Sequence, residues 1–186
     1  ESGKRVLVVG LADEISSNSV DPAKVKLLAA VILTDPIRKN AQETIQYFYK
    51  QGVDVKVISG DDPTTVAAVA KRAGIKNAHI AVDMTKIRDD EIEEAAQKYT
   101  VFGRVTPNQK KLLVSAMQNA GRNVAMTGDG VNDLLAMKQA NCSIAVGQGS
   151  DAARQTAQLV LLDSDFSVLR NVIAEGRRVI NNLTKS

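Results

Sequence analysis

The sequence predicts an α/β fold in which a mostly parallel sheet carries helices on both faces. Short apolar runs, which suit strands, alternate with longer amphipathic runs, which suit helices, over most of the 186 residues. This alternation is typical of strand–helix–strand units in a parallel sheet. Glycine, proline, aspartate and asparagine punctuate the runs, as expected of the turns between elements. Aromatic residues are scarce, so aliphatic side chains must fill the core.

The first elements are two strands and a helix. Residues 4–9 are expected to form a strand, and the polar residues 13–20 a loop. The run Val25–Leu33 is continuously apolar, so we expect a second strand that is buried on both faces. Asp35-Pro36 ends it, and a helix follows over residues 39–51. Gly52 stands where a glycine C-terminal cap is expected.

The remaining elements alternate in type. Strands are expected at residues 53–58, 79–82, 100–102, 122–126, 144–146 and 159–162. Helices are expected at residues 64–73, 91–98, 107–119, 134–140 and 166–183. Two of these helices begin beside a proline, Pro63 and Pro107, because proline is well suited to the first helical turn. The connections between parallel strands should be right-handed.

Composition excludes several classes of protein. The net charge is only +3 and the basic residues are scattered, so there is no nucleic-acid footprint. The single cysteine, Cys142, lies in an apolar run and is expected to be a buried structural thiol. No stretch reaches the roughly 20 apolar residues that a membrane-spanning helix requires.

The run from Met126 to Asp133, Met-Thr-Gly-Asp-Gly-Val-Asn-Asp, is the most informative feature of the chain. It follows an apolar run, so its polar groups should lie at the carboxyl edge of the sheet, where α/β folds bind ligands. Asp129 and Asp133 are four residues apart and can face one pocket. Two neighbouring carboxylates favour a cation between them, and oxygen ligands of this kind suit Mg²⁺. The alternative is an ordinary Asp-Gly turn.

Two further features could join the same pocket. Ser59-Gly60-Asp61 also follows an apolar strand and precedes a helix, which is a favourable place for an anion; alternatively, Ser59 is a simple turn or capping residue. Lys110, near the start of the helix at Pro107, could direct its ammonium at a phosphate. For a single lysine, a solvated position on the helix face is the alternative, and Lys111 is its immediate neighbour.

A hydroxyl, then a lysine, then an acidic pair is the motif order of haloacid dehalogenase-like phosphotransferases, and several strings resemble P-type cation-transporting ATPases in particular. The string from Thr127 to Asp133 resembles the hinge motif of these pumps, and Asp35-Pro36-Ile37-Arg38 resembles their domain-boundary segment. Val57 to Asp61 is similar to their Thr-Gly-Asp motif with serine for threonine. Further matches lie at residues 102–110, 160–163 and 175–182. Leu134-Leu135 after Asn-Asp resembles a bacterial branch of which some members are linked to Ca²⁺.

The resemblance implies a haloacid dehalogenase-like Rossmannoid fold and a role for each matching residue. Asp129 and Asp133 would hold Mg²⁺, with Asn132 and Asp133 orienting the phosphoryl group. Ser59 and Gly60 would bind phosphate oxygens, and Lys110 would neutralise their charge. The residues expected near ATP are Asp61, Arg104, Asp35 and Arg38. Such a site acts by positioning and charge stabilisation.

The nucleophile of the family, an aspartate in Asp-Lys-Thr-Gly-Thr, has no counterpart in this sequence. Asp83-Met84-Thr85 is a partial match, but it follows Ser59 whereas the nucleophile should precede it, so Asp83 is expected to be a loop residue or helix N-cap. The fold is therefore expected to lack the strand that carries the nucleophilic aspartate, which in this family lies at the centre of the sheet.

The resemblance implies a segment of an ATP-driven membrane cation pump. Residues 1–34 would be the end of the nucleotide-binding domain and the hinge, and residues 35–186 the C-terminal part of the phosphorylation domain. The implied partners are ATP, a cation (with Ca²⁺ as the candidate) handled by membrane helices absent here, and the rest of the pump polypeptide. The segment would lie on the cytoplasmic side of the cell membrane. The isolated segment should be inactive.

Two alternatives belong to other classes. A soluble haloacid dehalogenase-type phosphatase would use the same lysine and acidic pair, but it needs a nucleophilic aspartate after its first strand, where this chain has Gly10-Leu11-Ala12. A non-catalytic module that binds nucleotide or Mg²⁺ would keep the fold without the chemistry.

Overall fold

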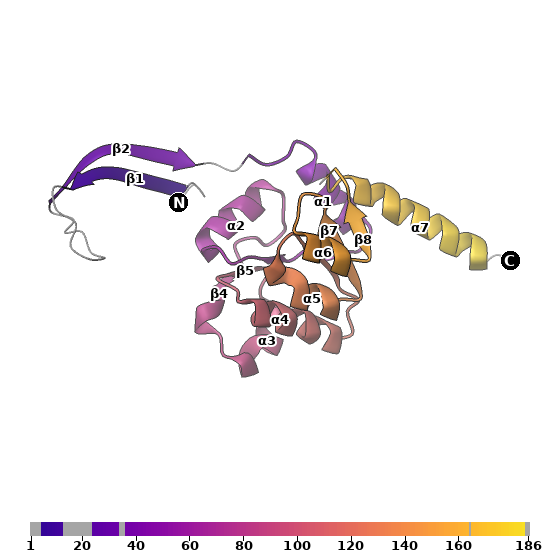
Figure 1. Ribbon diagram of the computed structural model, residues 1–186. Helices are drawn as coiled ribbons and strands as arrows, with labels where there is room; N and C mark the ends of the chain where they lie inside the picture. The colour runs from indigo at the N-terminus through magenta and orange to yellow at the C-terminus, as the bar shows by residue number, and fades with distance from the viewer. Residues whose placement is uncertain (1–4, 13–23, 34–35, 164, 185–186) are drawn as a thin grey trace.

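An antiparallel hairpin and an α/β body make up the described part of the chain (Figure 1). The structure is a computed structural model, and it describes residues 5–12, 24–33, 36–163 and 165–184. Strand β1 (Arg5–Ala12) pairs with β2 (Val25–Leu33), with an irregularity in register between Val9 and Gly10. The loop expected at residues 13–20 lies outside the described residues. Both expected strands are confirmed.

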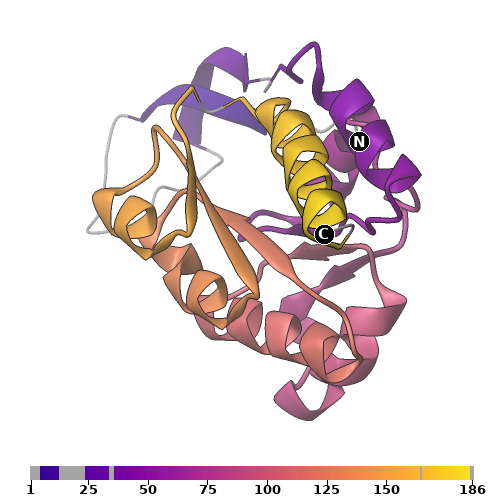
Figure 2. The same ribbon diagram turned by 90° about the vertical axis from the view of Figure 1, so that its right-hand side faces the viewer.

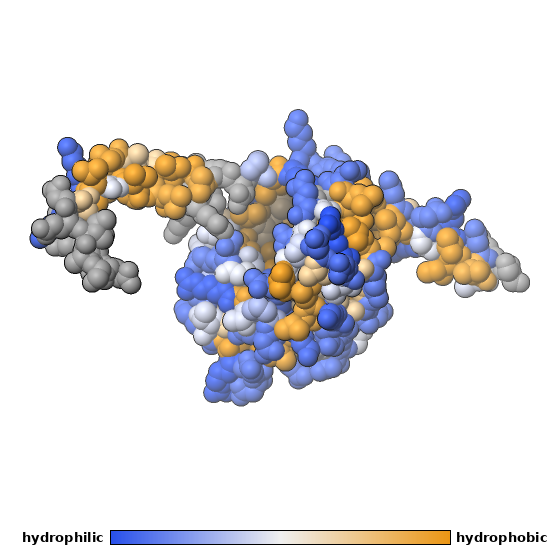
Figure 3. Space-filling model, in the orientation of Figure 1, coloured by the Kyte–Doolittle hydropathy of each residue, from blue (hydrophilic) through white to orange (hydrophobic). Residues whose placement is uncertain are grey.

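The expectation that Val25–Leu33 is buried is wrong. Every residue of β2 after Val25 is exposed, and Leu27 is 70% exposed. The hairpin extends away from the body, and Figure 3 shows its surface as largely apolar. Continuous hydrophobicity indicates burial for a strand inside a sheet, but among the described residues no layer covers either face of this two-stranded ribbon.

Within the described residues, the body is built from six strands and seven α-helices. Its strands are β3 (Val57–Ile58), β4 (Ala81–Asp83), β5 (Val101–Gly103), β6 (Ala125–Gly128), β7 (Cys142–Val146) and β8 (Leu159–Leu161). Its helices are α1 (Ala41–Lys50), α2 (Pro63–Arg72), α3 (Ile92–Lys98), α4 (Pro107–Asn119), α5 (Leu134–Gln139), α6 (Asp151–Thr156) and α7 (Val168–Thr184). The alternation of strands and helices expected from the sequence is confirmed.

These strands form two parallel sheets of three strands each, in the orders β3-β5-β4 and β6-β7-β8. Each sheet has an end strand, β3 in one and β6 in the other, that pairs on one side only within the described chain. The carboxyl ends of β3 and β6 line the same cavity. The mostly parallel α/β architecture is therefore confirmed, with the antiparallel hairpin as an addition.

Helices cover both faces of each sheet, as neighbouring residues on the central strands show. On β5, Val101 is buried in a cluster with α2, whereas Phe102 is buried in a cluster with α3 and α4. On β7, Ile144 packs with α1 and α7, and Ala145 packs with α4, α5 and α6. Successive side chains of a strand point to opposite faces, so α1, α2 and α7 form one layer and α3 to α6 the other. Figure 2 shows α7 running beside α1.

Two helices pack across both sheets. On α1, Ile45 contacts the β5 cluster, whereas Phe48 belongs to the β7 cluster. On α4, Leu113 and Val114 are both almost completely buried, in the clusters that cover β5 and β7 respectively. One helix on each face therefore connects the two sheets, which fixes the position of β3 relative to β6.

Element boundaries differ from expectation at a few points. β3 is only two residues long, and β6 begins three residues later than expected and includes Gly128. Helix α6 was not expected, because its residues Asp151–Thr156 carry little apolar periodicity. Gly52, at φ +76°, follows α1 in the left-handed conformation expected of its cap. Cys142 is only partly buried, beside the cluster around Ile144. Within the described residues, no helix has the length and hydrophobicity to cross a bilayer.

Candidate functional site

A cavity of about 340 Å³ opens at the carboxyl ends of β3 and β6. This is the edge of the sheet where the sequence analysis placed the polar motifs. Its lining comes from the strand–turn–helix units after β3 and β6, from α4 and from β7. The lining residues are Ile58, Ser59, Gly60, Lys110, Met126, Thr127, Gly128, Asp129, Asp133 and Val146.

Asp133 is the most highly constrained acidic residue of this cavity. It ends a short 3₁₀ turn (Val131–Asp133) before α5 and is only 7% exposed. One carboxylate oxygen accepts a hydrogen bond from the Lys110 ammonium at 2.5 Å. The other oxygen faces the backbone N–H groups of Asp129 and Gly130 at 3.3 and 3.4 Å. Its charge is therefore neutralised by one cation and two amide dipoles.

Lys110 is held by the start of α4. Thr106 caps this helix by accepting a hydrogen bond from the N–H of Gln109, whose side chain accepts one from the N–H of Thr106 in return. This reciprocal capping box fixes the first turn, and Pro107 occupies the first helical position. Lys110 is 9% exposed, whereas Lys111 is exposed. The solvated position considered as the alternative therefore applies to Lys111 and not to Lys110.

Ser59 and Gly60 line the cavity from the turn after β3. The N–H of Ser59 donates to the carbonyl of Phe102 on the neighbouring strand, which fixes the end of β3. The hydroxyl oxygen of Ser59 accepts a hydrogen bond from the N–H of Asp61 at 3.1 Å. Gly60 is exposed, and a methyl group in place of its hydrogen would meet only Val105 O, at 4.0 Å. The turn thus presents a hydroxyl and an open stretch of backbone to the cavity.

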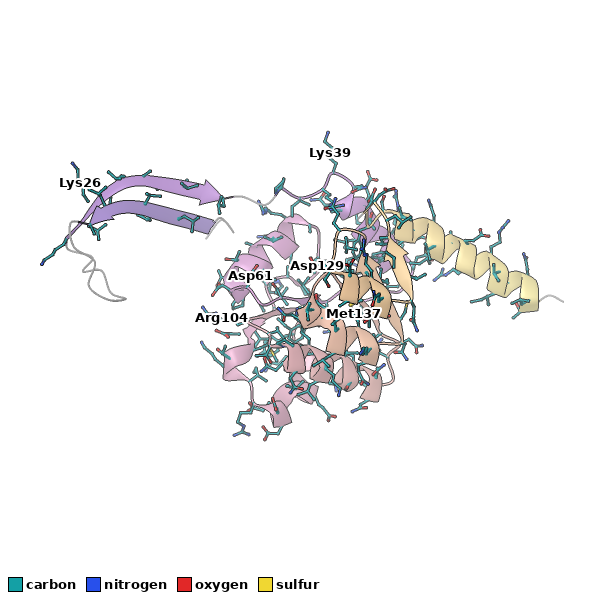
Figure 4. All side chains as sticks on the ribbon, in the orientation of Figure 1. Lys26, Lys39, Asp61, Arg104, Asp129 and Met137 are labelled. Carbon is teal, nitrogen blue, oxygen red and sulfur yellow. The ribbon has the colours of Figure 1, made fainter. Side chains whose placement is uncertain are left out.

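Asp129 differs from Asp133 in its surroundings. It lines the cavity but is exposed, and Figure 4 shows it in the region between Asp61 and Met137. The described residues contain no group of three or more His, Cys, Asp or Glu side chains placed to hold a metal. The two carboxylates of Asp129 and Asp133 still suit Mg²⁺, because this ion needs only one or two carboxylates and completes its coordination shell with waters and a phosphate. Asp129, with Asp133 behind it, would hold the ion.

Close packing fixes the turn after β6. A Cβ atom on Gly128 would lie 2.5 Å from Cβ of Asp133 and 2.8 Å from Sδ of Met137. Only glycine therefore allows α5 to approach the end of β6 at this distance. The motif glycine at position 128 has a packing function, which brings the Asp133 carboxylate against the backbone of Asp129.

Arg104 lies at the edge of the site and is not among the lining residues. Its guanidinium pairs with Asp62 at 2.9 Å and with Asp83 at 3.1 Å, and its N–H donates to the carbonyl of Asp61. Its backbone is left-handed, at φ +53°. The N–H of Thr64 lowers the pKa of Asp62, and the hydroxyl of Thr85 lowers the pKa of Asp83. Asp83 caps a short 3₁₀ turn, as expected.

The other residues expected near the site lie elsewhere or outside the description. Asn132 is exposed and does not line the cavity. Arg38 lies three residues before α1 and near Asp165, whose pKa is lowered chiefly by the N–H of Ser167 and to a smaller extent by the Arg38 charge. Asp61 is exposed beside the cavity. Asp35 lies outside the described residues.

Sequence reasoning missed the loop after β7. Gly147, Gly149 and Ser150 lie between β7 and α6, and Ser150 donates its backbone N–H to the carbonyl of Asp129 at 2.7 Å. The run Gly-Gln-Gly-Ser directly after a strand was the available signal, because closely spaced glycines after a strand indicate a close approach of two backbones.

Comparison with known proteins assigns the family. A model of the haloacid dehalogenase-like hydrolases matches residues 3–141. The chain belongs to this family. Its similar curated proteins include the probable cation-transporting ATPase exp7 of Streptococcus pneumoniae, 46% identical, and the calcium-transporting ATPase CtpE of Mycobacterium tuberculosis, 43% identical. Each match covers 98% of this chain but only 24% and 23% of the relative. The chain therefore spans about a quarter of the length of these relatives.

The fold comparison agrees. One crystal structure of a zinc-transporting PIB-type ATPase matches with a TM-score of 0.68 and 26% identity, over 99% of this chain and 24% of that one. A second crystal structure of a zinc-transporting PIB-type ATPase, in another state, matches with a TM-score of 0.63 and 25% identity, over 96% of this chain and 24% of the other. The haloacid dehalogenase-like fold expected from the motifs is confirmed, and the chain is similar to one segment of cation-transporting ATPases.

Proposed function

We propose that this chain supplies the Mg²⁺ and phosphate site of an ATP-driven membrane cation pump, on the cytoplasmic side. The observation that carries the proposal is the convergence of Ser59, Lys110, Asp129 and Asp133 on one cavity from three separate segments of the chain. The similarity to cation-transporting ATPases over 98% of the chain supports the same function.

Each residue has a role that its surroundings support. Lys110 would place a positive charge beside phosphate oxygens, and Asp133 holds the Lys110 ammonium in the cavity wall. Ser59 and Gly60 would donate hydrogen bonds to those oxygens. Asn132 does not line the cavity, so the motif alone supports its role of orienting the phosphoryl group with Asp133. When bound at Asp129, Mg²⁺ would offset the negative charge of the transferring group. These are the positioning and charge effects on which phosphoryl transfer depends.

The nucleotide would contact the rim of the cavity. Arg104 and Asp61 lie on the two segments that follow β5 and β3 and are linked by a backbone hydrogen bond. We propose that they contact ATP, with Asp35 and Arg38 at the boundary between two domains. In this proposal, residues 1–34 end a nucleotide-binding domain and residues 35–186 belong to the phosphorylation domain.

The aspartate that accepts the phosphate would come from another part of the polypeptide. The sequence contains no Asp-Lys-Thr-Gly-Thr. Within the described residues, β3 and β6 each pair on one side only and so have an open edge, and both strands end at the cavity. A strand between them would bring its carboxyl end to Lys110 and Asp129. The open edges support this arrangement.

Phosphorylation of the full-length protein tests the proposal. With ATP and Mg²⁺ it should form an acid-stable, hydroxylamine-sensitive acyl phosphate on a residue outside these 186, and a chelator should abolish it. The 186-residue chain alone should form none. Phosphate found on Asp83, or on any other residue of this chain, would contradict the proposal.

A matched pair of variants tests the metal assignment. Asp129→Asn should weaken Mg²⁺ binding far more than Asp83→Asn, because Asp83 lies outside the cavity lining and already pairs with Arg104. Equal effects would contradict the assignment of Asp129. Hydrolysis of a chromogenic phosphate ester by the chain alone would instead favour a phosphatase.

Calcium is the cation that we propose for transport. The support is the name of the 43% identical relative, a calcium-transporting ATPase. ATP-dependent uptake of radioactive Ca²⁺ into inverted membrane vesicles that contain the full-length protein should exceed uptake of other divalent cations. Vesicles that accumulate another ion and not Ca²⁺ would contradict this choice.

A further inference from the structure

The loop between β7 and α6 packs directly on the turn that carries Asp129. The N–H of Ser150 donates to the carbonyl of Asp129 at 2.7 Å, and the N–H of Gly149 donates to the carbonyl of Val146 at 2.8 Å. The first bond joins two turns that follow neighbouring strands of the β6-β7-β8 sheet. The backbone of Asp129 is thereby held through its carbonyl as well as through the amide that faces Asp133.

Gly149 allows this approach because it has no side chain. A Cβ atom there would lie 2.7 Å from the carbonyl oxygen of Asp129, 3.0 Å from its Cα atom and 2.9 Å from the carbonyl oxygen of Val146. All three are backbone atoms, which cannot move aside as the end of a flexible side chain can. Any residue larger than glycine must therefore separate the loop from Asp129.

Ser150 anchors the loop to a packed helix. Its hydroxyl oxygen caps α6 by accepting a hydrogen bond from the N–H of Ala153 at 3.2 Å. Ala153 is completely buried against α5 and β7. The carbonyl of Asp129 thus bonds to a residue whose own position is set by the core.

We infer that Gly149 and Ser150 are positioning residues for Asp129: they fix its backbone and thereby aim its exposed carboxylate into the cavity. The inference rests on the proposed role of Asp129 as a Mg²⁺ ligand. Residues that orient a metal ligand change metal affinity by about 10- to 100-fold when they are replaced. Gly149 and Ser150 act through Asp129 and are not ligands themselves.

The test is a Mg²⁺ titration of the 186-residue chain, followed through the backbone amide resonances of Asp129 and Gly130. Gly149→Ala should raise the dissociation constant for Mg²⁺ about tenfold or more. Gly176→Ala is the matched control, because a Cβ atom there meets nothing within 4 Å and the constant should be unchanged. Thermal unfolding of each variant separates a local displacement from a loss of fold.

Substitutions at Ser150 separate the cap of α6 from the backbone contact with Asp129. Ser150 has φ −61° and ψ 149°, which proline adopts without strain. Ser150→Ala removes only the cap of α6, whereas Ser150→Pro removes the cap and the N–H donor and also places its ring against the carbonyl oxygen of Asp129. Weaker Mg²⁺ binding in Ser150→Pro than in Ser150→Ala would support the inference, and equal binding would overturn it.

Hydrogen exchange gives a readout that does not depend on the metal. The Ser150 amide should exchange slowly in the unaltered chain and rapidly in Gly149→Ala. If Mg²⁺ binds the unaltered chain and Gly149→Ala equally well, the inference fails while the metal site stands. If Mg²⁺ does not shift the amide resonance of Asp129 in the unaltered chain, both the proposed metal site and the positioning role are contradicted.

Discussion

Lys110 and Asp133 form a buried ion pair, with 2.5 Å between the ammonium nitrogen and a carboxylate oxygen. Their side chains are only 11% and 10% exposed. A charge in such a place is costly unless it is paired and hydrogen-bonded. Asp133 meets this requirement with Lys110 and two backbone amides. The pair therefore sets the position of an ammonium group that lines the cavity.

Removing one partner of this pair should be strongly destabilising. Lys110→Ala leaves the Asp133 carboxylate buried without its cation, so we expect a loss of about 3 kcal/mol in the free energy of unfolding. Lys111→Ala, at an exposed position on the same helix, should change it by less than about 0.5 kcal/mol. Urea unfolding measures both. A loss in Lys110→Ala no larger than in Lys111→Ala would show that the pair is not buried as described.

Gly128 should tolerate no side chain. Gly128→Ala places a Cβ atom 2.5 Å from Asp133 and 2.8 Å from Met137, so α5 must move, and we expect a loss of about 1–3 kcal/mol in the free energy of unfolding. Gly176→Ala, in open space on α7, should instead stabilise by up to about 1 kcal/mol, because alanine favours the helix. A neutral Gly128→Ala would contradict the close contact.

The sequence pattern predicted the body of the fold because the hydrophobic periodicity of its strands and helices, and the turn residues between them, are local features of the sequence. Pro107–Asn119 matches α4 in full, since a capping threonine, a proline and an amphipathic run all lie within or beside the segment itself. The exposure of the strand Val25–Leu33 could not be predicted, because the exposed fraction of a strand depends on what covers it and not on its own residues. Helix α6 was missed because its stability comes from Ala153 in the core.

The candidate site was predicted only in part, because some of its features are local in the sequence and others depend on tertiary contacts. Asp129, Asp133, Lys110 and Ser59 follow from motif order, and the structure brings all four to the cavity. Which lysine turns inward, Lys110 or Lys111, depends on the tertiary contact with Asp133. The contact of Gly149 with Asp129 joins two turns that are 20 residues apart, and no local pattern encodes it.

The pH dependence of the free energy of unfolding should reveal the stabilising contribution of the Asp165 carboxylate. Its carboxylate accepts hydrogen bonds from the N–H of Ser167 at 2.8 Å and from the side chain of Asn40 at 3.1 Å. Of these, the bond from Ser167 contributes most to lowering its pKa below the ordinary 3.8. A carboxyl with a lowered folded-state pKa stabilises the fold above its unfolded-state pKa, and this contribution is lost as pH falls through the folded-state value.

We therefore expect the unaltered protein to be more stable than Asp165→Asn by a constant amount above about pH 5. The difference should shrink as the pH falls below the unfolded-state value of 3.8. Urea unfolding at a series of pH values measures it. A difference that grows towards low pH would contradict the sign of the pKa shift.

The protein should be more stable with glycine at position 104 than with alanine there. Its backbone, at φ +53°, is left-handed, which costs a non-glycine residue roughly 1–2 kcal/mol. Both Arg104→Ala and Arg104→Gly lose the pairs with Asp62 and Asp83, and because the guanidinium is half exposed these pairs contribute little. Only Arg104→Gly also relieves the backbone. We therefore expect it to exceed Arg104→Ala by about 1 kcal/mol in the free energy of unfolding, measured by urea titration. If Arg104→Ala were the more stable variant, the left-handed conformation would not be retained in the variants. A separate measurement of ATP affinity tests the nucleotide contact: an equal loss in both variants would assign this contact to the guanidinium.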